Sequence, residues 1–316
     1  MKVILAGTPD FASNIFAPLI KRGKFDIAAV LANSAKAGDR GRVTDPPAAV
    51  LAKKYGVPLL QFDKISSTEG IAALKTLDAD IMLTAAFGQI LSDEALSLFP
   101  KGVLNVHGSL LPKYRGASPI QSAILAGDTV TGITIMRTVK DVDAGDILLK
   151  EEIPILEQDT AGSMFEKLAA LGAKLAADAL KLVLTGKDTY TPQKHAEATF
   201  TKMLKKQDGK LDFFCPVRRL ELQVRAYNPW PGTFFSLFGK NLKIFRLTSA
   251  RACNILLPCN STQPGEVLVA NAKDGWFVQC GDGIAELCEV QPEGGRRMSA
   301  KQFLQGRVIP VGTVIN

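Results

Sequence analysis

The chain has 316 residues, of which 47% are hydrophobic and 22% are charged, and its formal net charge is +7. The composition is ordinary for a globular protein, and the length predicts two domains rather than one core. No apolar run reaches the roughly 18–20 residues that span a bilayer, and the run from Val3 to Gly7 is too short for a signal peptide, so we expect a cytoplasmic protein.

The first 188 residues alternate short apolar runs with helical patterns. The apolar runs predict strands at 2–7, 26–32, 57–60, 79–86, 102–107 and 132–138. Amphipathic segments at 46–56 and 68–77 predict helices between them. Because buried strands that alternate with helices form parallel sheets, we predict a Rossmann-like α/β domain with a mostly parallel sheet over 1–188. An antiparallel edge strand over 145–155 and a long helix over 160–186 complete this domain.

The turn after the first strand carries no nucleotide-binding motif. In the segment AGTPDFA, Gly7 is the only glycine, and Pro9 stands where a G-x-G-x-x-G loop needs its second glycine. The phosphate-binding pattern G-x-x-x-x-G-K-[ST] is also absent from the sequence. We therefore predict a tight strand-to-helix turn, and a nicotinamide dehydrogenase is disfavoured.

The pattern changes in the second part of the chain. A polar stretch without sustained periodicity, 189–208, predicts a linker. Residues 209–316 begin with one helical pattern, 215–227, and continue with short strand patterns separated by turn signals. These strands are predicted at 232–239, 241–247, 265–270, 275–281 and 283–290. Such spacing is typical of a small antiparallel barrel, and we predict an OB-like β-barrel domain.

The charge is unevenly distributed between the two parts. Residues 1–188 hold 21 Lys and Arg and 21 Asp and Glu, whereas residues 189–316 hold 17 and 10. The whole net charge therefore lies in the second part. This predicts either contact with a polyanion or a merely soluble basic surface, and charge alone favours neither.

The five cysteines all lie in the last third of the chain, at Cys215, Cys253, Cys259, Cys280 and Cys288. Their number is odd and no C-x-x-C pattern occurs, so the sequence predicts neither a disulfide framework nor a zinc site. We expect reduced, mostly buried thiols and no metal.

One of only two histidines follows a predicted central strand. His107 lies at the carboxyl end of the strand 102–107, where ligands of open α/β sheets usually bind. Asn105 is two residues earlier, so both side chains project from the same face of the strand. An amide donor beside an imidazole can hold a developing oxyanion and move a proton. A purely structural pair at a strand end explains the same pattern.

A third group favours the catalytic interpretation. The loop between the strands 132–138 and 145–155 contains Asp141, Asp143 and Asp146. If the strand 132–138 is a neighbour of the strand 102–107, this loop lies over His107, and one of its carboxylates can hold and polarise the imidazole. No serine or cysteine nucleophile is evident, and direct attack by a substrate amine on an activated carbonyl needs none.

The segment NVHGSLLPKYRGASPIQSAILAGDTVTGITIMRTVKDVDAGDI, 105–147, resembles the signature of the folate-dependent formyltransferases. The likeness extends over nearly the whole chain, and it is strongest to the branch of the family that acts on methionyl-tRNA. Further matches are AGTPDF (6–11), FGQIL (87–91), AYNPWPG (226–232), GDGIAEL (281–287) and KQFLQG (301–306).

The resemblance implies a reaction and its residues. The formyl group of 10-formyltetrahydrofolate would pass to the α-amine of initiator methionyl-tRNA, giving the formylated tRNA used to initiate translation. The family's catalytic asparagine, histidine and aspartate fall on Asn105, His107 and Asp143. Asn105 and His107 would steady the oxyanion, and Asp143 would fix His107 and favour its charged form. The family's folate-binding segment falls on Ser109, Leu110, Leu111 and Pro112.

The long loop 34–47 matches a loop that enters the tRNA acceptor stem in the resembled family. Its arginine beside a glycine falls on Arg42, with Arg40 as the second candidate. The surrounding residues are less basic than in the family, and a surface loop without a tRNA contact is the alternative. The basic second domain would bind tRNA phosphates, and we expect a monomer.

Three rival functions remain open. A formyltransferase for an amino-sugar nucleotide, or a folate-dependent hydrolase, would use the same asparagine, histidine and aspartate. A non-catalytic RNA-binding protein with an OB-like barrel would explain the charge but leave those three residues unused. A glycinamide ribonucleotide formyltransferase fits less well, because that family lacks the second domain.

Overall fold

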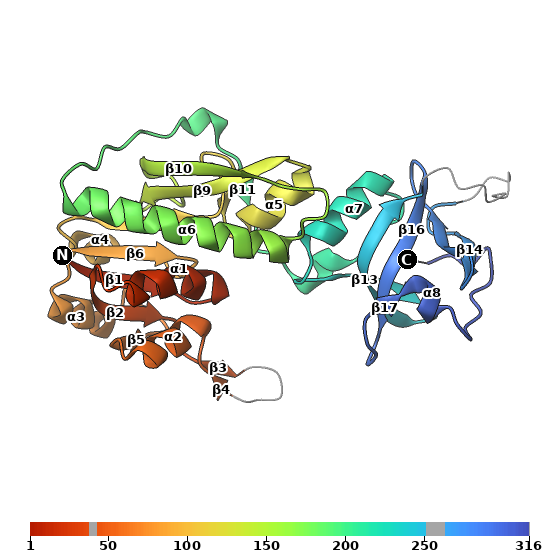
Figure 1. Ribbon diagram of the computed structural model, residues 1–316, viewed down its shortest axis with the longest axis horizontal. Helices are drawn as coiled ribbons and strands as arrows, with labels where there is room; N and C mark the ends of the chain where they lie inside the picture. The colour runs from red at the N-terminus through yellow and green to blue at the C-terminus, as the bar shows by residue number, and fades with distance from the viewer. Residues whose placement is uncertain (38–42, 251–262, 316) are drawn as a thin grey trace. The chain divides into compact units, whose positions relative to one another are not determined.

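The computed structural model describes residues 1–37, 43–250 and 263–315 (Figure 1). Two compact units are present. Unit 1 contains residues 1–119, 130–154 and 164–202, and unit 2 contains residues 120–129, 155–163 and 203–316. The segment 189–208, predicted as a linker, is divided between them, because its residues up to 202 pack with unit 1.

Unit 1 is built on a sheet with the strand order β10-β9-β7-β6-β1-β2-β5. Its strands are β1 (Lys2–Gly7), β2 (Asp26–Ala32), β5 (Leu59–Gln61), β6 (Ile81–Ala85), β7 (Val103–His107), β9 (Val130–Arg137) and β10 (Ile147–Pro154). The five strands from β7 to β5 run parallel, and β9 and β10 are antiparallel to their neighbours. The predicted mostly parallel sheet is confirmed.

Helices cover both faces of this sheet, which explains why its inner strands are apolar throughout. The helices α1 (Asp10–Lys21) and α2 (Pro47–Tyr55) pack on one face, and α6 (Ala161–Leu184) runs beside α1 on the same face (Figure 1). A Cβ at Gly172 of α6 would lie 3.2 Å from Val106 and 3.1 Å from Ile15, so the glycine permits close packing.

The opposite face of the sheet carries α3 (Thr68–Leu77) and α4 (Asp93–Ser97). Their apolar residues share one core with Ile4, Met82 and Val103, which alternate with the residues that face α1. Asn105 and His107 follow Val103 at period two, so their side chains belong to the α3 and α4 face.

The pairing of β7 with β9 positions the acidic loop. The two strands are neighbours, as predicted, with His107 opposite Thr134 and Leu104 opposite Arg137. They are antiparallel, so β9 ends near the start of β7. The loop 138–146 then returns across the face of the sheet before β10 begins.

Unit 2 contains an antiparallel sheet with the order β12-β13-β16-β15-β14, and β17 pairs with β16. Its strands are β12 (Thr233–Leu237), β13 (Lys240–Ser249), β14 (Val267–Asn271), β15 (Gly275–Gln279), β16 (Ile284–Pro292) and β17 (Met298–Ser299). Among the described residues, no ladder joins β12 to β14. The antiparallel sheet is confirmed, whereas the OB-like barrel is not confirmed, because the described strands form no closed barrel.

Aromatic side chains fill the core of unit 2. Trp276 is fully buried, stacks on Phe303 at 5.7 Å between ring centroids, and meets the edge of Phe235 at 5.9 Å. Cys280 lies in the same core, and burial raises the pKa of its thiol to about 12, so the thiol stays protonated at neutral pH. Cys253 and Cys259 lie outside the described residues.

The remaining elements are short or connect the sheets. They are β3 (Lys36–Ala37), β4 (Val43–Thr44), β8 (Arg115–Gly116), α5 (Pro119–Ala126), β11 (Phe200–Thr201), α7 (Val217–Ala226) and α8 (Ala300–Phe303). The parallel pair of β8 and β11 matters most for the site, because it holds the end of the predicted linker against the loop that follows β7.

Candidate active site

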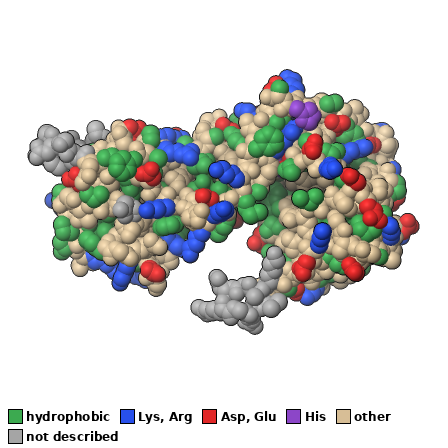
Figure 2. Space-filling model, turned by 180° about the vertical axis from the view of Figure 1, so that it is seen from behind, with side chains coloured by type: hydrophobic (Ala, Val, Ile, Leu, Met, Phe, Trp, Pro, Cys, Tyr) green, Lys and Arg blue, Asp and Glu red, His purple; other side chains and the backbone are tan. Residues whose placement is uncertain are grey.

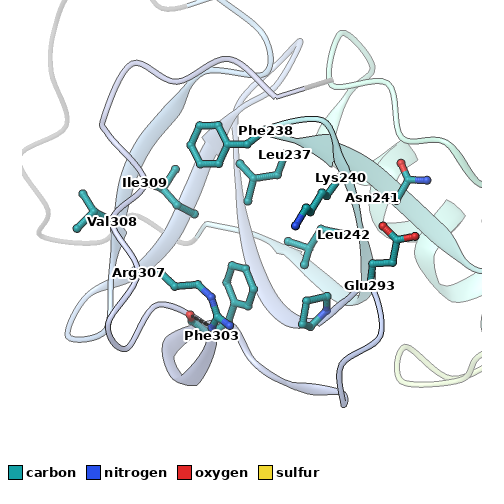
Figure 3. Close-up of a pocket in the computed structure, with 11 residues that line it drawn as sticks. Leu237, Phe238, Lys240, Asn241, Leu242, Glu293, Phe303, Arg307, Val308 and Ile309 are labelled. Carbon is teal, nitrogen blue, oxygen red and sulfur yellow. Dashed lines mark hydrogen bonds between the residues drawn. The ribbon is translucent and has the colours of Figure 1, made fainter.

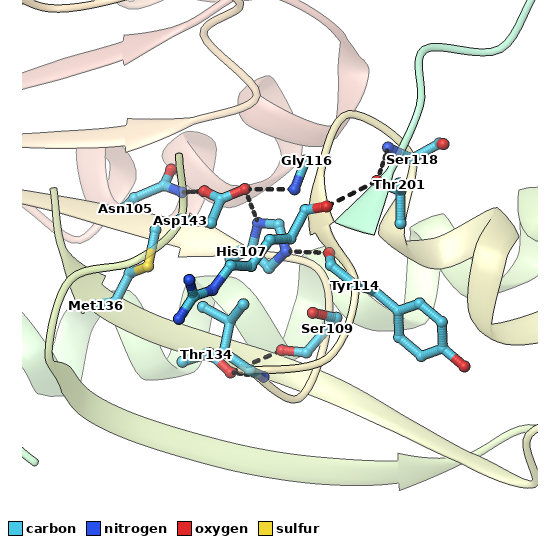
Figure 4. Close-up of polar contacts among 12 residues, drawn as sticks. Asn105, His107, Ser109, Tyr114, Gly116, Ser118, Thr134, Met136, Asp143 and Thr201 are labelled. Atoms are coloured by element: carbon cyan, nitrogen blue, oxygen red, sulfur yellow. Dashed lines mark hydrogen bonds and ion pairs between the residues drawn. The ribbon is translucent and has the colours of Figure 1, made fainter. Parts of the chain in front are cut away.

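Asn105 is held in one orientation by its neighbour on β6. The hydroxyl of Thr84 donates to Asn105 Oδ1 at 2.8 Å. Asn105 Nδ2 donates to Asp143 Oδ1 at 3.4 Å (Figure 4). A flipped amide would place an oxygen against the carboxylate, so these partners fix the amide with its nitrogen toward Asp143. One of the two amide hydrogens remains available to another acceptor.

His107 is buried, and both of its ring nitrogens face oxygen acceptors. Nε2 lies 2.9 Å from the carbonyl oxygen of Tyr114, and Nδ1 lies 3.5 Å from Asp143 Oδ2. A carbonyl only accepts, so Nε2 must carry a hydrogen. A neutral ring would then turn a lone pair toward the carboxylate. A hydrogen on Nδ1 would instead face the carboxylate, at a distance longer than an ordinary hydrogen bond.

The carboxylate of Asp143 contacts the other polar groups of the site (Figure 4). Its Oδ2 accepts a hydrogen bond from the backbone N–H of Gly116 at 2.7 Å in addition to facing His107. The residue has a φ of 49°, in the left-handed region that aspartate tolerates better than most residues. Two side chains of β7 and one backbone N–H of the segment that follows it therefore converge on one carboxylate.

The structure brings together the three side chains that the sequence predicted, and it distinguishes Asp143 from the other acids of the loop. Asp141 and Asp146 are exposed, whereas Asp143 is half-buried against His107. An amide donor, a proton-carrying imidazole and a carboxylate can together stabilise an oxyanion and transfer a proton.

Sequence analysis missed the backbone groups that complete the site. A Cβ at Gly116 would lie 2.6 Å from the carbonyl oxygen of Thr201, and Gly116 has a φ of 107°, so only glycine fits there. Tyr114, which presents its carbonyl to His107, has a φ of 61°. The Arg-Gly pair after a turn-rich stretch was the available signal, but it does not reveal where an N–H points.

Two of the four side chains in the segment assigned to folate binding are buried inside unit 1. Ser109 and Leu111 are fully buried, and Ser109 Oγ donates to the carbonyl of Lys113 at 2.7 Å. Leu110 and Pro112 are half-buried. Thr134 ties the segment to β9, because its hydroxyl donates to the carbonyl of Ser109 at 2.7 Å and accepts from the N–H of Leu111 at 3.1 Å. The folate assignment stays a prediction.

The two arginines predicted to contact tRNA, Arg40 and Arg42, lie outside the described residues. Of the basic groups on α7, Arg225 has a structural role, since its guanidinium donates to the carbonyls of Asp159 and Leu156 at 2.8 Å each. Arg218 forms an exposed ion pair with Glu221 at 3.0 Å. Figure 2 shows further Lys and Arg side chains spread over the surface of the molecule.

A groove of about 490 Å³ lies elsewhere, in unit 2, and is lined mainly by apolar residues (Figure 3). Its lining includes Phe238, Phe303 and Ile309, and none of the three predicted catalytic residues. Within the described ranges, no group of His, Cys, Asp and Glu side chains is arranged to hold a metal ion. None of the helices there has the length and apolarity needed to cross a bilayer.

Family models match both parts of the chain. Residues 1–180 match the formyl transferase family, and residues 203–308 match the formyl transferase C-terminal domain. Among curated relatives, the methionyl-tRNA formyltransferase of Geobacter metallireducens is 37% identical over 97% of this chain and 96% of its own length. That of Agathobacter rectalis is 38% identical over 99% of both chains.

Solved structures show the same fold at lower identity. HypX from Aquifex aeolicus in complex with tetrahydrofolic acid has a TM-score of 0.63 and 16% identity, and the match covers 96% of this chain and 46% of HypX. An N-formyltransferase from Helicobacter canadensis, in complex with folinic acid and dTDP-3-aminofucose, has a TM-score of 0.64 and 18% identity. That match covers 90% of this chain and 98% of the other.

Proposed function

The chain belongs to the formyl transferase family, and we propose that it transfers a formyl group from a folate to the α-amine of methionyl-tRNA. The observation that carries the proposal is the convergence of Asn105, His107 and Asp143 on one face of the sheet. The names of the full-length relatives support methionyl-tRNA as the acceptor. Such an enzyme of translation is expected in the cytoplasm, and we expect it to act as a monomer.

We propose 10-formyltetrahydrofolate as the formyl donor, a cosubstrate that supplies an activated formyl carbon. The loop that carries Asp143 exposes two apolar side chains, Val139 and Val142. We propose that they contact the flat aromatic part of the folate. Apolar walls with a few placed polar groups are typical of small-molecule sites. Leu110 and Pro112 are the members of the predicted folate segment with exposed surface.

Asn105, His107 and Asp143 would stabilise the charge that develops on the formyl oxygen and would move protons. The neutral amine of methionyl-tRNA attacks the formyl carbon, the new C–N bond forms, and the bond from that carbon to the donor nitrogen breaks. The free hydrogen of Asn105 Nδ2 would donate to the formyl oxygen as it becomes negative. The hydrogen at His107 Nδ1, which lies at ion-pair distance from Asp143, would be shared between that carboxylate and the same oxygen. Asp143 holds both donors in place. The proton between His107 and Asp143 gives the pair the means to protonate the departing nitrogen while accepting the amine's proton.

We propose that unit 2 and the loop 34–47 bind the tRNA. Residues 189–316 carry the whole net charge of +7, and phosphate contacts of Lys and Arg dominate the affinity for nucleic acids. Arg42, and secondarily Arg40, remain our candidates for a contact with the acceptor stem. The OB-like character of the antiparallel sheet also stays a proposal. These contacts would position the tRNA, whereas the chemistry belongs to unit 1.

The acceptor is tested by offering the purified protein and 10-formyltetrahydrofolate either methionyl-tRNA or dTDP-3-aminofucose. We expect formylated methionyl-tRNA as the product and no formylated sugar nucleotide. The rate should fall steeply with added salt through weaker tRNA binding. Formylation of the sugar nucleotide instead, or salt-sensitive tRNA binding without any formyl product, would contradict the proposal.

A further inference from the structure

We propose that Gln193 is a positioning residue for the pair of His107 and Asp143. The inference rests on the proposed function, because its kinetic test measures formyl transfer. Gln193 lies in the segment that the sequence predicted as a linker. Its side chain is buried, and it hydrogen-bonds to the backbone of the loop that carries Asp143. The residue touches no reacting group and acts through the backbone of that loop.

Both the nitrogen and the oxygen of the Gln193 amide form hydrogen bonds within the protein. Nε2 donates to the carbonyl oxygen of Asp143 at 2.9 Å and to that of Gly145 at 2.7 Å. Oε1 accepts from Arg115 at 3.2 Å through Nε and at 2.7 Å through Nη2. Carbonyls only accept and a guanidinium only donates, so the amide has one possible orientation. Gln193 therefore links Arg115 to the Asp143 loop in a fixed geometry.

Arg115 connects this link to the other side of the catalytic pair. It is buried, and its two sequence neighbours both contact the site: the carbonyl of Tyr114 faces His107 Nε2, and the N–H of Gly116 donates to Asp143. Gln193 thus joins the segment that holds one ring nitrogen of His107 to the loop that faces the other. Moving either segment changes the contacts of the imidazole.

The Asp143 loop needs such support from the protein. Asp143 has a φ of 49°, and its neighbours Val139 and Val142 are exposed, so apolar packing contributes little to the position of the loop. A buried amide with all its contacts satisfied specifies one arrangement of its partners. Misplacement of a reacting group by about 1 Å costs about 10²-fold in rate.

The test compares Gln193→Met, which keeps the length of the side chain and removes its hydrogen bonds, with Gln223→Met. Gln223 is a matched control in unit 2, since its Nε2 also donates to two backbone carbonyls, those of Asp208 and Lys210. For Gln193→Met we expect kcat to fall about 10- to 100-fold. KM for both substrates should stay within about twofold of the wild type, because no substrate contact is removed. Gln223→Met should keep the wild-type kcat.

A second readout does not depend on the reaction. The chain has only two histidines, so protein labelled with ¹⁵N-histidine reports His107 directly, with a His195→Gln variant used for assignment. Gln193→Met should shift or broaden the ring-nitrogen signals of His107, and Gln223→Met should leave them unchanged. Unchanged His107 signals, or a wild-type kcat, in Gln193→Met would overturn the inference.

A third variant covers the case in which Gln193→Met does not fold. Gln193→Glu keeps the acceptor for Arg115 but places a carboxylate oxygen against the two carbonyls, so we expect the same loss of kcat and the same change at His107. Wild-type kcat in this variant would overturn the inference. If the wild type itself transfers no formyl group to methionyl-tRNA, the proposed function fails, and the His107 signals still decide the role of Gln193.

Discussion

Formyl transfer by an Asp143→Asn variant is expected to fall by about 10³–10⁴-fold in kcat, the size of loss seen when the acid that orients a catalytic histidine becomes an amide. The carboxylate receives hydrogens from Asn105, from Gly116 and from the His107 side. An amide has one acceptor oxygen, so its nitrogen would face a donor at one of these positions. Asparagine at position 143 would also have no carboxylate to accept a proton from His107.

The matched control is Asp141→Asn, which makes the same chemical change two residues earlier in the same loop. Asp141 is exposed and its carboxylate takes no part in the site. We expect its kcat to be that of the wild type. Steady-state formylation of methionyl-tRNA gives both values, and thermal unfolding shows whether each variant is folded. Equal losses in the two variants would remove the special role of Asp143.

Replacement of His107 by alanine is expected to lower kcat by about 10²–10³-fold, the usual effect of losing one donor to a developing oxyanion. The change also removes the imidazole that faces the carbonyl of Tyr114 and one of the two groups that face Asp143 Oδ2. We therefore expect a lower unfolding temperature as well, because an unsatisfied buried polar group costs about 1–3 kcal/mol.

The loss of activity and the loss of stability are separated by assaying well below the unfolding transition of the variant. Under those conditions the variant is folded, and KM for methionyl-tRNA should stay near the wild-type value because we propose that other residues bind the tRNA. A folded His107→Ala variant with near-normal kcat would show that the imidazole has no part in the reaction.

The sequence predicted the sheet of unit 1 and the closeness of Asn105 and His107 well, because both follow from strand periodicity. The sequence did not reveal the direction of β9. A strand that is buried on both faces has the same apolar pattern whether it is parallel or antiparallel to its neighbours. The antiparallel pairing is what returns the loop 138–146 across the face of the sheet. The adjacency was predictable, and the path of the loop was not.

The choice of Asp143 among three acids came from family likeness, and the structure shows its physical basis. Spacing alone does not distinguish Asp143 from Asp141 and Asp146, because the distinction depends on a left-handed φ and on an N–H donated by Gly116. Gln193 escaped notice for a related reason. A polar stretch without periodicity reads as a linker, and the pattern does not show that one amide in it is buried against two carbonyls.

The OB-like barrel predicted for unit 2 shows another limit of strand patterns. Alternating runs with turn signals identified the antiparallel strands, and β12, β13, β14, β15 and β16 fall where they were expected. Closure of a barrel depends on which end strands pair and with what stagger. Strand spacing along the sequence carries no information on that pairing.

The central claim is that His107 and Asp143 act as one unit on the transfer of the formyl group. Its most direct test is the single-turnover rate of formyl transfer to methionyl-tRNA by the double variant Asp143→Asn/His107→Ala. Residues that act as a unit have strongly non-additive effects. We predict that the double variant is about as slow as the slower of the two single variants. A double variant whose rate has fallen by the product of the two separate losses would contradict the account.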